Sequence, residues 1–273
     1  MWNGQGMMQH WNRWDGHVGR RRLLMGFCVW GAVLPGLAFA GLPETVQQLK
    51  PSVLMVGTYA ETDTPRFNFR GTGFAVLEGR HVLTNAHVIP EAAALVEGRR
   101  LVVQVPEGKG KWNQRIAMVV AQDASRDLAL LSIDGAPVKP LRLASAEQLR
   151  EGMDIALMGF PLAGAVGYTA VTHRGVLAAM TDVVLPPPVA QALSPRAIRQ
   201  LRDGGFQVMQ LDATAYPGNS GGPVFDPDSG LVLGVVSMVL IKGTRESALS
   251  TPTGITYAIP ADVAAEFIRS SKP

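Results

Sequence analysis

The sequence predicts an all-β protein of two lobes that ends in a short helix. Short apolar runs recur at regular spacing and turn residues separate them, which is typical of sandwiches and barrels rather than of βαβ units. The 30 Gly and 19 Pro among the 273 residues supply those turns. A break in the runs near residues 137–150 divides them into an expected N-terminal lobe, 41–136, and an expected C-terminal lobe, 137–260.

Each lobe contains several expected strands. In the first lobe they are the apolar runs at 52–59, 73–77, 81–84, 101–105, 116–120 and 128–133. Glu78-Gly79-Arg80 separates the second run from the third, and this short spacer with a central glycine predicts a hairpin. In the second lobe the runs lie at 154–159, 168–172, 176–180, 206–209 and 231–237.

Two segments have the pattern of short helices. Within an expected surface loop at 181–205, Ser194-Pro195 supplies a cap and a first residue, and Gly204 supplies a stop. The second helix is expected in the C-terminal segment, 261–273. Three of its apolar residues share one helical face: Val263, Phe267 and Ile268.

The first 40 residues have the three parts of a secretory signal peptide. A basic segment ends in Arg20-Arg21-Arg22, an apolar run follows at 23–34, and Ala38-Phe39-Ala40 offers small residues for cleavage. We therefore expect residues 1–40 to be removed and the protein to be exported, to the periplasm or outside the cell. Two alternatives stay open: an uncleaved leader that anchors the chain in a membrane, and export by a twin-arginine rather than a Sec route.

The net positive charge of the chain lies in this leader. The formal net charge is +3 and the pI is about 9.2. The leader contains four arginines and only one acidic residue, Asp15. Residues 41–273 carry no net formal charge. The basic pI therefore gives no reason to expect a nucleic-acid partner. The lone cysteine, Cys28, is also in the leader, which excludes a disulfide framework and argues against a cysteine-based zinc site.

The most informative stretch is Tyr216-Pro217-Gly218-Asn219-Ser220-Gly221-Gly222-Pro223. A nucleophilic serine needs an exposed hydroxyl on a tight turn and nearby backbone N–H groups, and the glycines around Ser220 permit both. The same letters fit the nucleophile elbow of α/β-hydrolases. That interpretation fails because an elbow enters a helix and precedes its histidine, whereas strand-like residues and no histidine follow Ser220.

The order His, Asp, Ser is present instead. His87 follows the run at 81–84, Asp127 directly precedes the run at 128–133, and Ser220 comes last. This order is one of those in which catalytic triads occur. We interpret three competing residues as structural: His81 in a hairpin, His173 in a strand, and Asp123 as the cap of the turn before Asp127.

Six motifs in register carry a family resemblance. They are Gly71-Thr72-Gly73-Phe74, Thr84-Asn85-Ala86-His87-Val88, Asp123-x-x-x-Asp127-Leu128-Ala129-Leu130, Gly159-Phe160-Pro161, the stretch from Asp212 to Pro223, and Gly254-Ile255-Thr256-Tyr257-Ala258-Ile259-Pro260. With them the chain resembles the chymotrypsin-fold, trypsin-like serine proteases, and most closely their bacterial HtrA/Deg-type branch. The resemblance implies two antiparallel six-stranded β-barrels with the active site in the cleft between them.

The resemblance also implies roles for the site residues. Ser220 would attack the scissile carbonyl, His87 would accept and return the proton, and Asp127 would orient His87. The N–H groups of Gly218 and Ser220 would form the oxyanion hole. Thr214 would lie at the base of the primary specificity pocket, and Val236, Ser237 and Met238 would form part of its wall. Because Thr214 carries no charge, we expect an aliphatic P1 residue rather than Arg or Lys.

The sequence thus predicts an exported serine endopeptidase that acts on proteins or peptides, with a role in protein quality control as a hypothesis. The alternative is a protease-fold peptide-binding protein or holdase with little or no cleavage. We expect no metal and no cofactor, because a triad needs neither. We expect no PDZ domain after Ser220, a trimer is one oligomeric state that the resemblance allows, and the loops 181–205 and 240–253 are candidates for gating the site.

Overall fold

The computed structural model describes residues 41–91, 95, 98–108, 110–161, 167–183, 206–237 and 254–273. The leader, the helix expected within 181–205, Met238 and the segment 240–253 lie outside these residues. Of the helices in the described ranges, none has the length and apolar character needed to cross a membrane.

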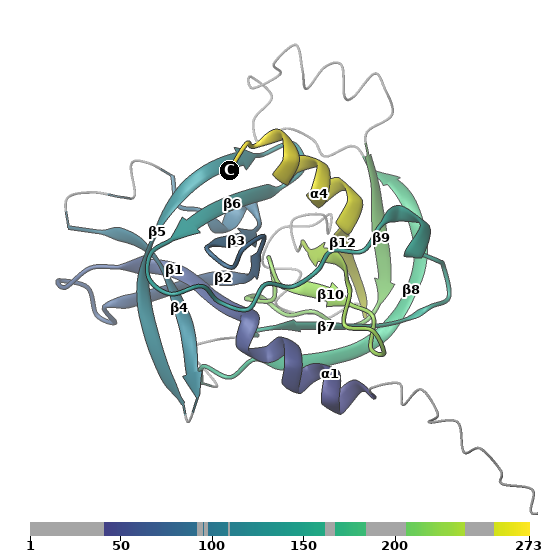
Figure 1. Cartoon of the computed structure of the whole chain (residues 1–273), viewed down its shortest axis with the longest axis horizontal. Coiled ribbons are helices and arrows are strands. Elements are labelled where there is room, and N and C mark those ends of the chain that lie inside the picture. Colours follow the sequence, from purple (N-terminus) through teal and green to yellow (C-terminus); the bar gives the residue numbers. More distant parts are fainter. Residues whose placement is uncertain are drawn as a thin grey trace, which may run out of the picture. The chain divides into compact units, whose positions relative to one another are not determined.

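The first half of the chain forms a closed antiparallel barrel, shown in purple to teal in Figure 1. Neighbouring strands follow the order β1-β2-β3-β6-β5-β4, and β4 pairs with β1 to close it. We call this barrel 1. Its strands are β1 Val53–Tyr59, β2 Phe67–Val76, β3 His81–Thr84, β4 Arg100–Gly108, β5 Lys111–Asp123 and β6 Leu128–Ile133.

The second half forms another closed antiparallel barrel, barrel 2, in green to yellow (Figure 1). Its order is β10-β11-β12-β9-β8-β7, closed by the pairing of β10 with β7. Two six-stranded barrels confirm the predicted fold class. The strands are β7 Asp154–Gly159, β8 Val171–Val183, β9 Phe206–Asp212, β10 Pro223–Phe225, β11 Val232–Val236 and β12 Ile255–Pro260.

Strand β8 differs most from the sequence prediction. The runs expected at 168–172 and 176–180 meet in one strand, Val171–Val183, which also takes in residues 181–183 of the expected loop, and residues 184–205 lie outside the described residues. Polar residues and a glycine at 173–175 interrupt the apolar pattern, but they do not end the strand. Gly175 is where the backbone of Asp212 approaches: a Cβ at Gly175 would lie 2.2 Å from the Asp212 carbonyl oxygen. The glycine therefore marks a close approach and not a turn.

Several strands are buried on both faces, which explains their continuous apolar runs. Along β6, Leu128 and Leu130 pack into one hydrophobic cluster, while Ala129 and Leu131 pack into another. In β7 the same alternation assigns Ile155 to a third cluster. This is the two-residue period of a strand with apolar partners on each side.

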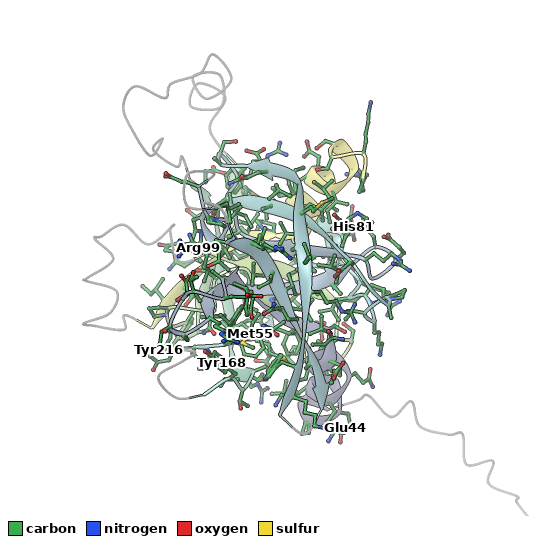
Figure 2. The ribbon with its side chains drawn as sticks, turned by 90° about the vertical axis from the view of Figure 1, so that its left-hand side faces the viewer. Glu44, Met55, His81, Arg99, Tyr168 and Tyr216 are labelled. Atoms are coloured by element: carbon green, nitrogen blue, oxygen red, sulfur yellow. The ribbon has the colours of Figure 1, made fainter. Side chains whose placement is uncertain are left out.

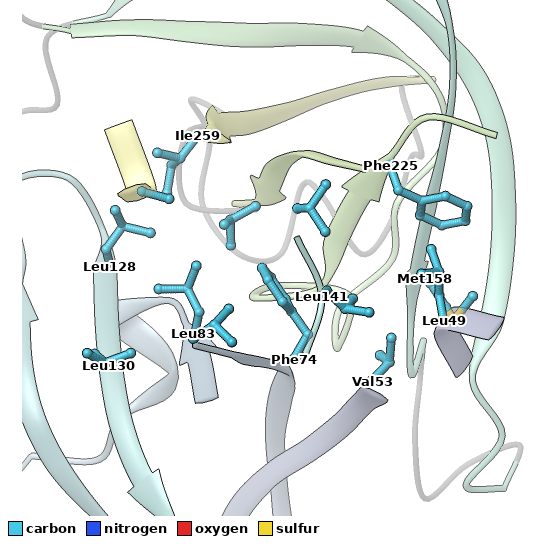
Figure 3. Close-up of a cluster of buried hydrophobic side chains, with 14 of the residues drawn as sticks. Leu49, Val53, Phe74, Leu83, Leu128, Leu130, Leu141, Met158, Phe225 and Ile259 are labelled. Carbon is cyan, nitrogen blue, oxygen red and sulfur yellow. The ribbon is translucent and has the colours of Figure 1, made fainter. Parts of the chain in front are cut away.

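The three clusters divide the molecule in a simple way. One contains residues of barrel 1 and a second contains residues of barrel 2. The remaining cluster, which contains Leu128 and Leu130 and which we call the shared core, draws side chains from both barrels and from both ends of the described chain. Figure 3 shows Phe74, Leu83 and Leu128 of barrel 1 in one cluster with Met158 and Ile259 of barrel 2. The two barrels are thus joined by a continuous apolar interface.

Two α-helices border the shared core. The expected C-terminal helix is confirmed as α4, Ala261–Ser270, which buries Phe267 and Ile268. Helix α1, Leu42–Leu49, was not predicted, although Pro43 in its first turn is a start signal, and its Leu49 also enters the shared core. Short 3₁₀ turns lie at η1 Lys50–Ser52, η2 Ala86–Val88 and η4 Ala146–Gln148.

Candidate active site

His87 lies in the 3₁₀ turn η2, directly after β3 ends at Thr84. Asn85 still has an extended backbone, and the 3₁₀ turn begins after it. Ala86 and Val88, on either side of His87, are buried and anchor this turn. The imidazole stays partly accessible, with 23% of the side chain exposed. The two buried neighbours thus hold the His87 ring at a place where solvent and substrate can reach it.

Asp127 is bonded to His87 through both carboxylate oxygens. His87 Nδ1 lies 2.9 Å from Oδ1 and 2.9 Å from Oδ2 of Asp127, and the His87 backbone N–H donates to Oδ1 at 3.1 Å. The carboxylate is nearly inaccessible, with 6% of the side chain exposed. A buried acceptor on Nδ1 favours the tautomer that carries its proton there, which leaves Nε2 free to accept a proton.

Two further bonds fix Asp127 in place. The Ser237 hydroxyl donates to Oδ2 at 2.6 Å, and the Asn85 side-chain amide donates to the Asp127 backbone carbonyl at 2.9 Å. Asp127 has a left-handed backbone, with φ of 53°, which Asp tolerates better than most residues. The predicted capping role of Asp123 is confirmed, since its Oδ1 accepts the N–H groups of Ser125 and Arg126 just before Asp127.

The segment before Ser220 is a type II turn. The Asn219 N–H donates to the Tyr216 carbonyl at 3.0 Å, Pro217 takes the second position, and Gly218 has φ of 103°. In this turn the N–H of Gly218 does not take part in the closing bond. Within the described part of the chain, no hydrogen bond uses the N–H of Gly218 or of Ser220. These are the two donors that the sequence assigned to the oxyanion hole.

Thr72 of β2 ties this turn to barrel 1. Its N–H donates to the Ser220 carbonyl at 2.8 Å, and its hydroxyl donates to the Gly218 carbonyl at 2.6 Å. The same hydroxyl accepts the Phe160 N–H at 3.1 Å. Thr72 belongs to one of the sequence motifs, but its contacts with Gly218, Ser220 and Phe160 could not be predicted from that motif.

The backbone after Ser220 lies against the segment that carries His87. A Cβ at Gly221 would lie 2.1 Å from the Thr72 carbonyl oxygen and 3.2 Å from the Asn85 nitrogen. Nucleophile and histidine segments are therefore in direct contact. Among the hydrogen bonds of the described residues, none joins Ser220 Oγ to His87; catalytic hydrogen bonds are often long without substrate.

The expected pocket residues have different surroundings. Thr214 is partly exposed, while Val236 is fully buried in β11. The hydroxyl of Ser237 is bonded to Asp127, so this side chain supports the Asp–His pair, a role that the sequence did not indicate. Met238 lies outside the described residues.

His173 lies beside the turn rather than in the Asp–His pair. Its ring lies 5.9 Å from that of Tyr216, measured between centroids, and Nε2 is buried without a hydrogen-bond partner in the described ranges. Burial lowers the pKa of His173 below its ordinary value, because the charged form loses water. In the part of the chain that is described, no group of three or more His, Cys, Asp or Glu residues could hold a metal ion.

Comparisons with known families and proteins agree on one kind of relative. A family model described as a trypsin-like peptidase domain matches residues 71–235. A probable periplasmic serine endoprotease, DegP-like, of Halomonas elongata is 30% identical over 194 residues, which cover 71% of this chain and 33% of the relative. Protease Do-like 5, chloroplastic, of Arabidopsis thaliana is 29% identical over 195 residues, covering 70% of this chain and 54% of that protein.

A longer match and a solved structure agree with these. The mitochondrial serine protease HTRA2 of Bos taurus is 26% identical over 261 residues, covering 93% of this chain and 48% of the relative. An HtrA-type protease solved with a tripeptide superimposes with a TM-score of 0.58 at 23% identity, over 84% of this chain and 62% of that one. This likeness concerns the fold. The chain spans about a third of the length of the DegP-like relative and about half of the other two curated relatives.

Proposed function

Because the chain belongs to the trypsin-like peptidase domain family, we propose that it is an exported serine endopeptidase that hydrolyses peptide bonds with Ser220, His87 and Asp127. One observation carries the proposal. A buried carboxylate holds His87 Nδ1 at 2.9 Å beside the backbone of a serine that follows a type II turn. This constellation serves acyl transfer, since it prepares a base and a nucleophile in adjoining segments.

In the first step, Ser220 Oγ attacks the scissile carbonyl carbon and its proton passes to His87 Nε2. The resulting imidazolium is stabilised by the Asp127 carboxylate, which accepts from Nδ1. The C–N bond then breaks, and the leaving amine takes the proton from His87. Water repeats the sequence on the acyl-enzyme, which releases the acid and restores Ser220.

The negative charge that develops on the carbonyl oxygen needs donors that are already in place. The N–H groups of Gly218 and Ser220 are the candidates, because the type II turn leaves both out of its own hydrogen bond. Removing one such donor in other enzymes costs about 10²–10³ in kcat. The two bonds of Thr72 to the carbonyls of Gly218 and Ser220 would keep these peptide planes from turning.

Export and physiological role form the finer part of the proposal. The predicted leader at 1–40 supports export, and the DegP-like relative is named periplasmic. We take unfolded or damaged proteins as the substrate class, with an aliphatic residue before the scissile bond. Sequencing the N-terminus of the exported protein tests the leader: a start after Ala40 is expected, and a start at Met1 would leave the membrane-anchored alternative.

The activity is tested with purified protein lacking residues 1–40, on casein and with a fluorophosphonate probe. Ser220→Ala should reduce casein cleavage to the background and abolish labelling, because the probe reacts only with an activated hydroxyl. Ser145→Ala, which alters a serine in the cap of η4, is the matched control and should keep both activities. Cleavage by Ser220→Ala at the wild-type rate would contradict the assignment, whereas a wild-type protein that binds casein without cutting or labelling would favour the holdase alternative.

A further inference from the structure

A row of aromatic side chains leads away from the turn that precedes Ser220. We call Phe69, Phe67 and Tyr168 the aromatic strip. Phe69 and Phe67 are two residues apart on β2 and are both partly exposed, and Tyr168 is 38% exposed. The rings of Phe67 and Tyr168 meet edge to face, with centroids 6.3 Å apart. The strip therefore joins β2 of barrel 1 to the segment before β8 of barrel 2.

The strip begins at the expected oxyanion hole. A Cβ at Gly218 would lie 2.9 Å from Cε1 of Phe69, so the Phe69 ring packs directly on the turn. Its other side meets Phe160, with centroids 6.4 Å apart, and Phe160 meets Trp112 at 5.6 Å. The buried Phe160 and the partly buried Trp112 thus support the strip. Tyr168 and Tyr216 both lie at the left of Figure 2, on the opposite side from His81.

The spacing along the strip matches that of an extended peptide. Residues two apart on a strand point to the same face and are separated by about 6.6 Å along it. A substrate segment in the same extended conformation repeats its side chains at the same interval. Two alternate side chains of such a segment could therefore contact Phe69 and Phe67 in turn, with Tyr168 beside the second.

The backbone at Ser220 and Gly221 is bonded to β2 and to the expected P1 pocket through different groups. The Gly221 N–H donates to the Val236 carbonyl at 2.9 Å, next to Ser237. The Thr72 N–H donates to the Ser220 carbonyl, two residues after Arg70 and three after Phe69 on β2. His87, which returns its proton to the leaving amine, follows β3, and β3 pairs with β2 in barrel 1. The leaving segment is therefore expected on the barrel 1 side of Ser220, where β2 lies.

We infer that the aromatic strip is a subsite for large apolar side chains at alternate positions after the scissile bond. The inference rests on the proposed function and adds a second specificity element to it. The chemistry is burial of apolar and ring surface from water, with edge-to-face ring contacts for aromatic residues. An apolar leaving segment would be selected even when the residues before the scissile bond are unchanged.

Quenched fluorogenic peptides test this with one constant sequence before the scissile bond. Three leaving segments are compared: Phe-Ser-Phe-Ser, Ser-Phe-Ser-Phe and Ser-Ser-Ser-Ser. We expect kcat/KM for one alternating segment to exceed that for the serine segment by about tenfold, the usual scale of discrimination by an apolar contact. The other alternating segment should behave like the serine segment, because its rings point away from the strip.

Variants connect the preference to the strip. Tyr168→Ser should lower kcat/KM for the preferred segment by about threefold to fivefold and leave the serine segment unchanged, while Tyr168→Phe should keep the preference. Met118→Ser is the matched control, because Met118 is 67% exposed on β5, which does not adjoin β2 in barrel 1. It should leave all three values unaltered. The serine segment also reports whether each variant is folded and active.

The outcomes separate the two proposals. Equal kcat/KM for the three segments, an equal gain for both alternating segments, or an undiminished preference in Tyr168→Ser would overturn the strip and leave the protease intact. If the wild-type protein cleaves none of the peptides and is not labelled by fluorophosphonate, the proposed function fails, and the subsite fails with it.

Discussion

At the scale of single residues, the candidate site depends on two unusual backbone conformations. Asp127, with φ of 53°, presents its carboxylate to His87 and Ser237 and its carbonyl to Asn85. Gly218, with φ of 103°, occupies the position of a type II turn that requires a positive φ. Asp127 orients His87, the expected base, and Gly218 shapes the turn that carries the expected oxyanion donors.

Gly218→Ala should therefore impair catalysis. The new methyl group would lie 2.3 Å from the Phe160 carbonyl oxygen and 2.9 Å from the Phe69 ring, and its backbone would be strained. The turn must shift, and with it the N–H of Gly218. We expect kcat/KM to fall by about 10²–10³, measured on a fluorogenic peptide.

Gly152→Ala is the matched control for this change. Gly152 also has a positive φ, 83°, but a Cβ there would meet nothing within 4 Å. It should cost stability through backbone strain and leave kcat/KM unchanged. Equal activity of the two variants would show that the turn at Gly218 does not hold an oxyanion donor.

The sequence predicted the site only in part at this scale. The order of His87, Asp127 and Ser220 and the glycines around the serine identified the candidates, because local chemistry demands those residue types. The bond from Ser237 to Asp127 could not be predicted in the same way. It joins residues 110 positions apart and depends on how the end of β11 meets the turn before β6.

At the scale of elements, strand β8 places a half-buried histidine beside the turn of the site. The pKa of His173 is lowered by burial, so the folded protein binds a proton less readily than the unfolded chain, whose histidine titrates near 6.5. As the pH falls through about 6.5, the unfolded state gains protons first. Stability that is fully present above this pH is lost progressively below it.

His173→Gln should remove this part of the pH dependence. In urea unfolding at pH 7.5 and pH 5, the wild-type protein should lose more stability on acidification than the variant does. A variant whose loss of stability between the two pH values equals that of the wild type would contradict the assignment of His173 as a neutral, half-buried group.

The elements themselves were largely predictable where the apolar runs were clear. The six strands of barrel 1 and the helix α4 follow from periodicity and turn residues. The interruption within β8 was misinterpreted because glycine is common in turns, whereas Gly175 is needed here to let the Asp212 backbone approach. The strand-like interpretation of the residues after Ser220 is confirmed at β10, Pro223–Phe225, whereas β12, Ile255–Pro260, was not among the predicted strands.

At the scale of the whole molecule, two barrels share one core. The sequence divided the chain into two lobes, and the resemblance to HtrA-type serine proteases is confirmed by the family match and the relatives. The shared core was not predicted. A strand that is apolar on both faces does not reveal which face meets its own barrel and which meets the other.

Phe74→Ala tests the shared core. Phe74 is fully buried among residues of both barrels, so its loss leaves a cavity at their interface. We expect the free energy of unfolding to fall by about 3–5 kcal/mol, measured by urea unfolding. Met118→Ala, at a side chain that is 67% exposed, should change it by less than about 0.5 kcal/mol. A small effect of Phe74→Ala would mean that the barrels are joined only loosely.

Thr72 has a consequence for how such a protein can diversify. Its three bonds to Gly218, Phe160 and Ser220 mean that the backbone around the nucleophile takes its conformation from the opposite half of the chain. Neither half alone supplies all the hydrogen bonds that hold this backbone. A chimaera that takes one barrel from a relative is therefore expected to keep this backbone only where the incoming half offers a hydroxyl and an amide at the position of Thr72.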